Sequence, residues 1–68
     1  MRETGSRIRD LRDEMGLTQI ELAARIGIAH NTIAQYENGK CKMSIDVLIK
    51  IVKVMETSAD YLLGLRDR

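Results

Sequence analysis

The 68-residue sequence contains no proline, phenylalanine or tryptophan, and its aromatic residues are two tyrosines. Without proline, no position is barred from a helix interior, and the glycines stand between periodic segments rather than within them. Because aromatic residues are scarce, any core must be built from Leu, Ile, Val, Met and Ala. These absences favour an all-α fold of packed helices over a β-sandwich.

Cysteine occurs once, as Cys41, so the chain itself cannot form an internal disulfide. No second cysteine and no histidine stand at metal-ligand spacing from it, so we expect no metal ion and no cofactor. The single histidine, His30, lacks a Ser, Cys or paired carboxylate at a convincing catalytic spacing, and there is no glycine-rich phosphate loop. We therefore expect no enzyme, and no small-molecule ligand is evident.

Long apolar runs are also missing, because Lys50 and Lys53 interrupt the most apolar segment well short of the roughly 20 residues that span a bilayer. Charged residues dominate the N-terminal segment, where no signal-peptide pattern is visible. The length leaves room for one domain. We expect a single domain over residues 1–68 that is cytoplasmic and has no contact with membranes.

The net charge of +1 argues neither for nor against nucleic acid, so the distribution of charge matters more. Basic residues gather in two places, which are the N-terminal Arg2, Arg7, Arg9 and Arg12 and the pair Lys40 and Lys42. If folding brings both groups to one side, they flank a surface for DNA. The alternative is an ordinary solvated surface.

Residues 18–39 read as two short helices joined by a tight turn. Thr18 and Glu21 have the spacing at which a cap hydroxyl and a carboxylate satisfy each other's backbone amides, so a helix is predicted over residues 18–26. Its buried stripe is formed by Leu22, Ala23 and Ile26. Gly27 supplies the left-handed backbone conformation that ends such a helix.

A second helix is predicted over residues 29–38, ending at Gly39, with Ile33 and Tyr36 facing inward. Its opposite face carries four uncharged hydrogen-bonding residues, His30, Asn31, Thr32 and Gln35. Asn and Gln can pair two-fold with an adenine edge, and Thr and His can bond to other bases. This face therefore suits the major groove of DNA.

Three further helices are predicted around these two. The first covers residues 4–15, with the apolar positions Ile8, Leu11 and Met15 and a cap at Thr4 or Ser6. The second covers residues 44–56, with Ser44 as cap and a buried stripe of Leu48, Ile51, Val52 and Met55. The third covers residues 59–63, between the cap Ser58 and Gly64.

The last two helices carry more apolar residues than so small a domain can bury. The surplus includes Val47, Ile49 and Val54. Of the C-terminal Tyr61, Leu62, Leu63 and Leu65, at least one should be buried, and the others add to the surplus. An exposed apolar patch marks an association surface, so we expect a homodimer with an interface at Ala59, Tyr61, Leu62 and Leu65. The alternative is that long charged neighbours cover these residues.

The sequence resembles the lambda-repressor-like helix-turn-helix family from about residue 5 to residue 65. The residues that carry the resemblance are Ile8-Arg-x-Leu-Arg12, Gly16-Leu-Thr-Gln-x-Glu-Leu-Ala23, Ile26-Gly27, Thr32-Ile33, Tyr36-Glu-Asn-Gly-Lys40, Leu48 and Asp60-Tyr-Leu-Leu-Gly64. The resemblance implies a compact five-helix domain with a central helix-turn-helix. It also implies a transcriptional repressor that binds double-stranded operator DNA as a two-fold dimer.

Carried over by position, the resemblance implies base readout by His30, Asn31 and Gln35. It implies phosphate contacts or bracing by Gln19, Thr32, Asn38, Lys40 and Lys42, and a pairing of Arg12 with Glu37 that keeps Arg12 near the DNA. Phosphate contacts fix the docking register, whereas base contacts choose the sequence.

The sequence departs from the family pattern at three places. Ala29 replaces a common capping Ser or Thr, Met43 replaces a frequent Pro, and Glu56-Thr57 replaces a Gly or Asn ending. The first departure removes a helix cap, the second loosens the loop before Ser44, and the third strains the turn after the helix predicted over residues 44–56. A helical protein-interaction module that binds a toxin or a transcription component remains the alternative function, although such a module needs no polar groove-facing set.

Overall fold

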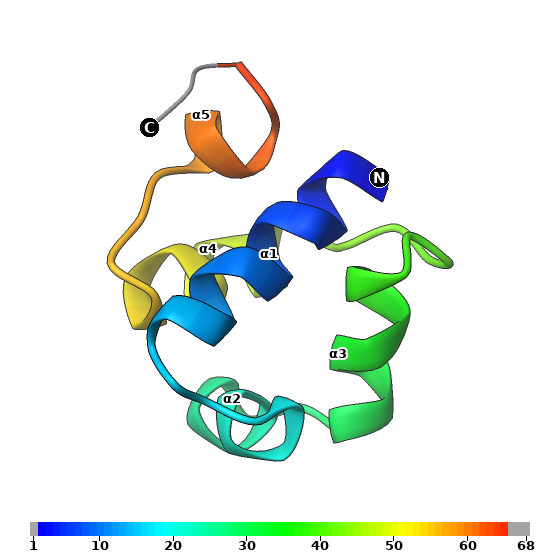
Figure 1. Ribbon diagram of the computed structural model, residues 1–68. Coiled ribbons are helices and arrows are strands. Elements are labelled where there is room, and N and C mark those ends of the chain that lie inside the picture. The colour runs from blue at the N-terminus through cyan, green and yellow to red at the C-terminus, as the bar shows by residue number, and fades with distance from the viewer. Residues whose placement is uncertain (1, 66–68) are drawn as a thin grey trace.

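The computed structural model describes residues 2–65, which form five helices and no strand. These are α1 (Arg2–Glu14), α2 (Gln19–Ile26), α3 (His30–Glu37), α4 (Ile45–Val54) and α5 (Ala59–Leu62). α1 crosses the middle of the molecule, α2 lies beneath it, α3 lies to one side and α4 lies behind (Figure 1). The predicted all-α, five-helix fold is confirmed, and the domain boundaries at residues 1 and 68 stay a prediction. No helix in residues 2–65 is long and apolar enough to cross a membrane.

The predicted caps of α2, α4 and α5 are confirmed. The Thr18 hydroxyl accepts from the Glu21 amide at 3.0 Å, and the Glu21 carboxylate accepts from the Thr18 amide at 2.9 Å. The Ser44 and Ser58 hydroxyls accept from the amides three residues later, at 3.2 Å and 3.1 Å. Each cap satisfies an amide that the first turn of a helix leaves without a partner.

The first helix is present, but its bounds and its cap differ from the prediction. α1 starts at Arg2, so Thr4 and Ser6 lie inside the helix instead of capping it, and Thr4 is buried. Met15 lies beyond the last helical residue, Glu14, so it leaves the apolar stripe and is 40% exposed. Gly5 also lies inside α1, contrary to the expectation that glycines stand only between helices.

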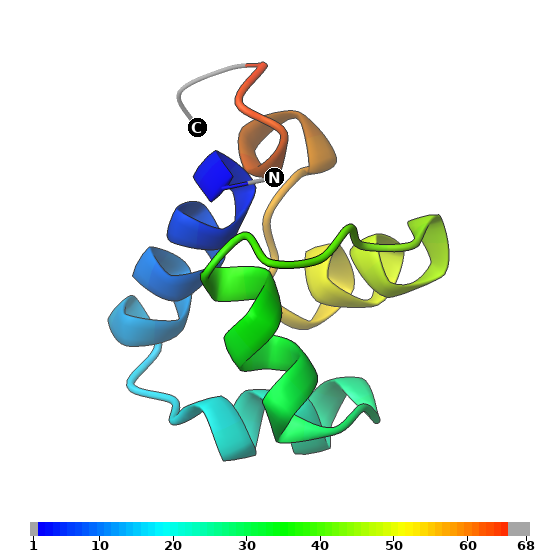
Figure 2. The ribbon, with the colours of Figure 1, turned by 90° about the vertical axis from the view of Figure 1, so that its right-hand side faces the viewer.

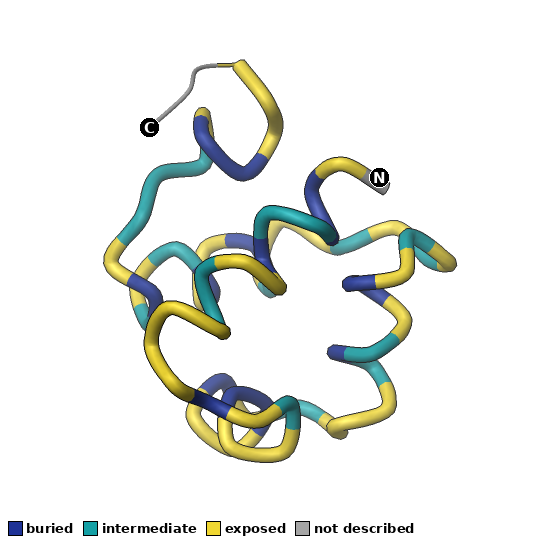
Figure 3. The backbone as a smooth tube through the Cα atoms, in the orientation of Figure 1, coloured by how far each residue is buried: buried dark blue, intermediate teal, exposed yellow. Residues whose placement is uncertain are grey.

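The core is a single cluster that contains side chains from all five helices. Its fully buried members are Ile8, Leu22, Ile33, Ile51 and Leu62. On α3, the buried stretches of backbone lie on the side toward the other helices, and exposed stretches lie on the outer side (Figure 3). The predicted stripe on α4 is confirmed at Leu48, Ile51 and Met55, whereas Val52 is only half-buried at its edge.

The chain reversals with left-handed backbone geometry include those at Gly27 and Glu56. Gly27 ends α2 with φ of 88°, as predicted. Glu56, just after α4, has φ of 51° although it carries a side chain. Because this conformation is unfavourable for residues with a Cβ atom by about 1 kcal/mol, the predicted strain at this corner is present.

Candidate nucleic-acid interface

The inner face of α3 is fixed by the core. Ile33 is fully buried, Tyr36 is 8% exposed, and Glu37 is 4% exposed although it carries a charge. The predicted inward positions, Ile33 and Tyr36, are confirmed. Burial, and to a lesser extent the nearby Cys41, raises the pKa of the Tyr36 phenol, which keeps it neutral.

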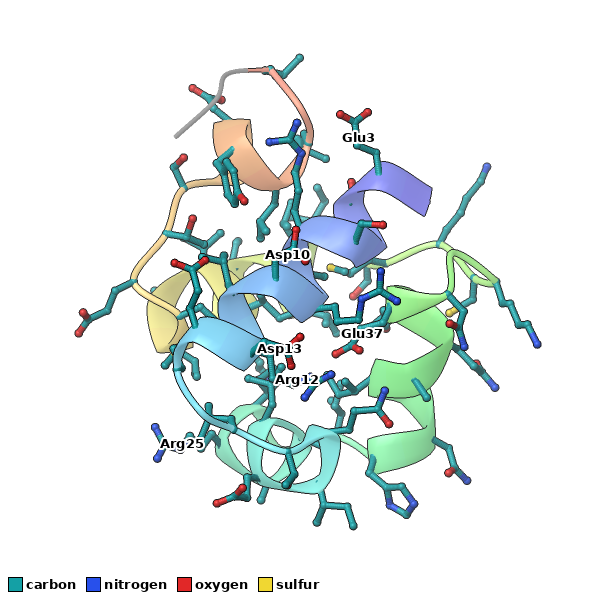
Figure 4. The ribbon with its side chains drawn as sticks, viewed as in Figure 1. Glu3, Asp10, Arg12, Asp13, Arg25 and Glu37 are labelled. Carbon is teal, nitrogen blue, oxygen red and sulfur yellow. The ribbon has the colours of Figure 1, made fainter. Side chains whose placement is uncertain are left out.

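The predicted pairing of Arg12 with Glu37 is confirmed (Figure 4). Arg12 Nε donates to Glu37 Oε2 at 2.7 Å, and Arg12 Nη2 donates to Oε1 at 3.1 Å. Arg12 Nη1 also donates to the carbonyl of Leu17 at 2.8 Å. The hydrogen bond to Glu37 raises the pKa of Arg12 against the opposing effect of burial, so the guanidinium stays charged. This planar two-point contact holds α1 and α3 at one geometry.

Gln19 completes a hub between three helices, which we define as Arg12, Gln19 and Glu37. Gln19 Nε2 donates to Glu37 Oε1 at 3.1 Å, so the start of α2 is tied to the end of α3. This bond braces the last turn of α3, and a contact of Gln19 with phosphate stays a prediction. The spacing of Ile33, Tyr36 and Glu37 places all three on one face, and this spacing could have revealed a buried carboxylate that needs such partners.

The outer face of α3 carries the three predicted base-reading residues. His30, Asn31 and Gln35 are exposed, and Thr32 beside them is half-buried. Within residues 2–65, the side chains of these three exposed residues make no hydrogen bond or ion pair. Figure 2 shows α3 at the front of the molecule, with no other helix lying over it. Their hydrogen-bond donors and acceptors are therefore available to bind another molecule.

The start of α3 lacks a side-chain cap. Ala29 occupies the N-cap with extended geometry and forms no side-chain hydrogen bond, and the first turn holds no acidic residue. The predicted loss of a cap is confirmed. The positive end of the helix dipole therefore lies beside His30 and Asn31 without an acidic residue in the first turn, which favours an anion there.

The end of α3 leads into a loop with a defined shape. Gly39 has φ of 70°, its amide donates to the Tyr36 carbonyl at 3.1 Å, and the Lys40 amide donates to the Gln35 carbonyl at 2.9 Å. These two bonds form a Schellman motif. The predicted phosphate-binding residues Asn38, Lys40 and Lys42 are exposed on this loop, which Figure 2 shows at one end of α3 while α2 lies at the other.

The N-terminal arginines do not form one basic group with this loop. Arg7 donates to Glu3 at 2.9 Å and lies over the Tyr61 ring at 4.9 Å, so it faces α5. Arg12 is held within the hub. The side chain of Arg2 lies outside the part of the chain that is described. Folding therefore does not bring Arg7 to the side of the polar face.

The predicted dimer residues separate into buried and exposed ones. Leu62 is fully buried and Tyr61 is 8% exposed, so both belong to the core of one chain. This placement corrects their assignment to an association surface. Leu65 is 72% exposed and Ala59 is half-buried. A dimer contact at Ala59 and Leu65 stays a prediction.

No group of three or more His, Cys, Asp or Glu side chains in residues 2–65 is placed to hold a metal ion. Cys41 is a half-buried free thiol on the loop after α3. The surface around α3 offers hydrogen-bonding side chains, lysines and the start of a helix. Such groups can bind a polyanion that also presents hydrogen-bond donors and acceptors.

The sequence matches a family model described as helix-turn-helix over residues 8–62. The uncharacterized HTH-type transcriptional regulator YobD of Bacillus subtilis is 39% identical over 61 residues, which cover 90% of this chain and 54% of that protein. The HTH-type transcriptional regulator ImmR of the same species is 35% identical over 60 residues, which cover 88% of this chain and 47% of that protein. The chain thus spans about half the length of these two relatives.

A similar solved structure is that of the P22 c2 repressor in complex with a synthetic operator. It is matched with a TM-score of 0.85 and 27% identity over 91% of this chain and 94% of that one. Sequence and structure agree with the resemblance that the motif residues predict. The chain belongs to the helix-turn-helix family.

Proposed function

We propose that this chain is a sequence-specific, double-stranded-DNA-binding regulator of transcription that places α3 in the major groove. The observation that carries the proposal is the outer face of α3, where His30, Asn31 and Gln35 are exposed without internal hydrogen bonds. The hub holds the opposite side of the same helix. A recognition helix needs both properties, because free base-reading groups must be presented at one fixed angle.

The proposed contacts divide into two groups. His30, Asn31 and Gln35 read base edges, where Asn and Gln pair well with adenine. Phosphate contacts come from both ends of the motif, namely from Gln19, Thr32, Asn38, Lys40 and Lys42. Arg12 is engaged by Glu37, so its role is to set the position of α3 rather than to bind phosphate.

We further propose that the chain acts as a repressor, and that two copies bind a palindromic operator in the cytoplasm of a prokaryotic cell. The P22 c2 repressor, which has this fold, is described in complex with a synthetic operator. Two copies related by a two-fold axis would place their α3 helices in half-sites about 34 to 36 Å apart. Occupying such a site blocks access to the DNA beneath it.

The test is a titration with random duplex DNA at two salt concentrations. Each neutralised phosphate releases counterions and contributes about 0.9 to the slope of log affinity against log salt. We expect steep weakening with salt, and a shallower slope for the double variant Lys40→Ala, Lys42→Ala.

A matched control is the double variant Lys50→Ala, Lys53→Ala, which removes the same charge from the exposed side of α4. Its slope should equal that of the wild type. Absence of salt-dependent association by the wild-type chain contradicts the proposal and favours a module that binds only proteins.

A further inference from the structure

Gly5 lies inside α1 and packs against the backbone of α3. A Cβ atom on this residue would lie 2.1 Å from the carbonyl oxygen of Tyr36 and 2.7 Å from that of Glu37. Glycine is less favourable than alanine within a helix, so local helix formation does not explain it. Its role lies in the close approach of the two helices.

The obstacle that a side chain would meet is backbone, which cannot move aside by changing rotamer. A carbon atom and a carbonyl oxygen on packed helices ordinarily stay about 3.3 Å apart. An alanine at this position therefore requires α1 or the end of α3 to move by about 1 Å. By contrast, a Cβ atom on Gly64 would meet the flexible side chain of Glu3, at 3.2 Å.

The carbonyl groups that touch Gly5 lead directly into the loop with the proposed phosphate contacts. The Tyr36 carbonyl accepts from the Gly39 amide at 3.1 Å, and the neighbouring Gln35 carbonyl accepts from the Lys40 amide at 2.9 Å. A displaced Tyr36 carbonyl cannot keep this Schellman geometry. Displacing α1 instead would pull on the 2.7 Å bond between Arg12 and Glu37.

We infer that Gly5 is a positioning residue for DNA binding. Its lack of a side chain allows α1 to pack closely against the end of α3, and this packing fixes the position of the loop that carries Asn38 and Lys40. This inference rests on the proposed function for its effect on DNA. The packing of Gly5 against the loop can be tested separately, without DNA.

The first experiment compares Gly5→Ala with Ile51→Val, a variant of a fully buried core residue on α4 that does not touch the contact of Gly5 with α3. Binding to random duplex DNA is measured well below both melting temperatures. We expect Gly5→Ala to weaken binding about tenfold and to make the salt slope shallower by about 1 to 2, because contacts at Asn38 and Lys40 are lost. Ile51→Val should keep wild-type affinity and slope. Wild-type affinity and slope in folded Gly5→Ala would overturn the inference.

If Gly5→Ala does not fold, the comparison is made in a Glu56→Gly background, where glycine relieves the left-handed strain at φ of 51°. A second measurement needs no variant and no DNA, since it follows amide hydrogen exchange in the wild-type chain. The Gly39 and Lys40 amides should open together with those of α1. Much faster exchange at Gly39 and Lys40 than in α1 would overturn the packing of Gly5 against the loop and with it the inference. Failure of the wild type to bind DNA would overturn the proposed function and the role of Gly5 in DNA binding, whereas the packing would still be decided by the exchange result.

Discussion

The two faces of α3 differ in how they are held. The inner face, with Ile33, Tyr36 and Glu37, is buried, and its carboxylate accepts hydrogen bonds from α1 and α2. The outer face, with His30 and Asn31 among its exposed residues, has no such bonds within residues 2–65. An isolated helix of eight residues is not stable in water, so the inner contacts make the outer face possible. Stability and recognition are thus placed on opposite sides of one short helix.

The largest expected effect comes from breaking the hub at Glu37. The side chains of Arg12 and Glu37 are 13% and 2% exposed, so Glu37→Ala leaves a largely buried guanidinium without its carboxylate. Removing one partner of a buried ion pair lowers the free energy of unfolding by about 3 kcal/mol. Urea unfolding measures the loss.

The control for this prediction is Glu3→Ala, which breaks the pair with Arg7 at the surface, where the Glu3 side chain is 70% exposed. Surface pairs contribute about 0 to 1 kcal/mol, so the control should lose little. Equal losses in the two variants would show that the inner face of α3 is not held as described.

The second prediction concerns the outer face. Gln35→Ala should leave the free energy of unfolding within about 0.5 kcal/mol of wild type, because the side chain is exposed. Its binding to a sequence selected from a random DNA pool should be weaker by about 1 to 3 kcal/mol in binding free energy. It should also distinguish less well between bases at one position of that sequence. Lys53→Ala on α4 serves as a control that should change neither quantity. A Gln35→Ala variant that still selects the same sequence would remove this residue from base readout.

The third prediction compares the starts of the two motif helices. Thr18→Ala removes the cap of α2 and should lower the free energy of unfolding by about 1 kcal/mol. Ala29→Ser adds a hydroxyl at the uncapped start of α3 and should raise it by about 0.5 to 1 kcal/mol. Thermal unfolding of both variants measures the changes. Changes of the same sign would contradict the cap geometry.

The smallest expected effect is a dependence on pH. The Thr18 amide, and secondarily its hydroxyl, holds the pKa of the Glu21 carboxyl below its ordinary value. The ionised form therefore stabilises the folded state above the ordinary pKa of a glutamate, and this contribution is lost as the pH falls through the lowered pKa. Glu21→Gln should show a smaller loss of stability than wild type between neutral and acidic pH, measured by urea unfolding at each pH. Identical pH profiles would contradict this role for Glu21.

Much of the fold could be predicted from the sequence because the signals are local. A cap needs only two residues three positions apart, so Thr18 with Glu21, Ser44 and Ser58 correctly marked three helix starts. The pairing of Arg12 with Glu37 followed from the family resemblance.

The remaining features depend on how the helices dock, which local patterns do not specify. The bond from Gln19 to Glu37 joins residues 18 positions apart, and the role of Gly5 depends on how closely α1 approaches α3. The burial of Tyr61 and Leu62 was missed because a helix of four residues has too few turns to reveal which side faces inward.

The claim that the outer face of α3 binds DNA is tested most directly by an NMR titration of the isotope-labelled chain with duplex DNA. We expect the largest amide shift changes at the start of α2, along residues 30–35 and in the loop over residues 38–42. We expect small changes along α4 and α5. Changes confined to α4 and α5, or no change at low salt, would contradict the claim that the outer face of α3 is the surface that meets DNA.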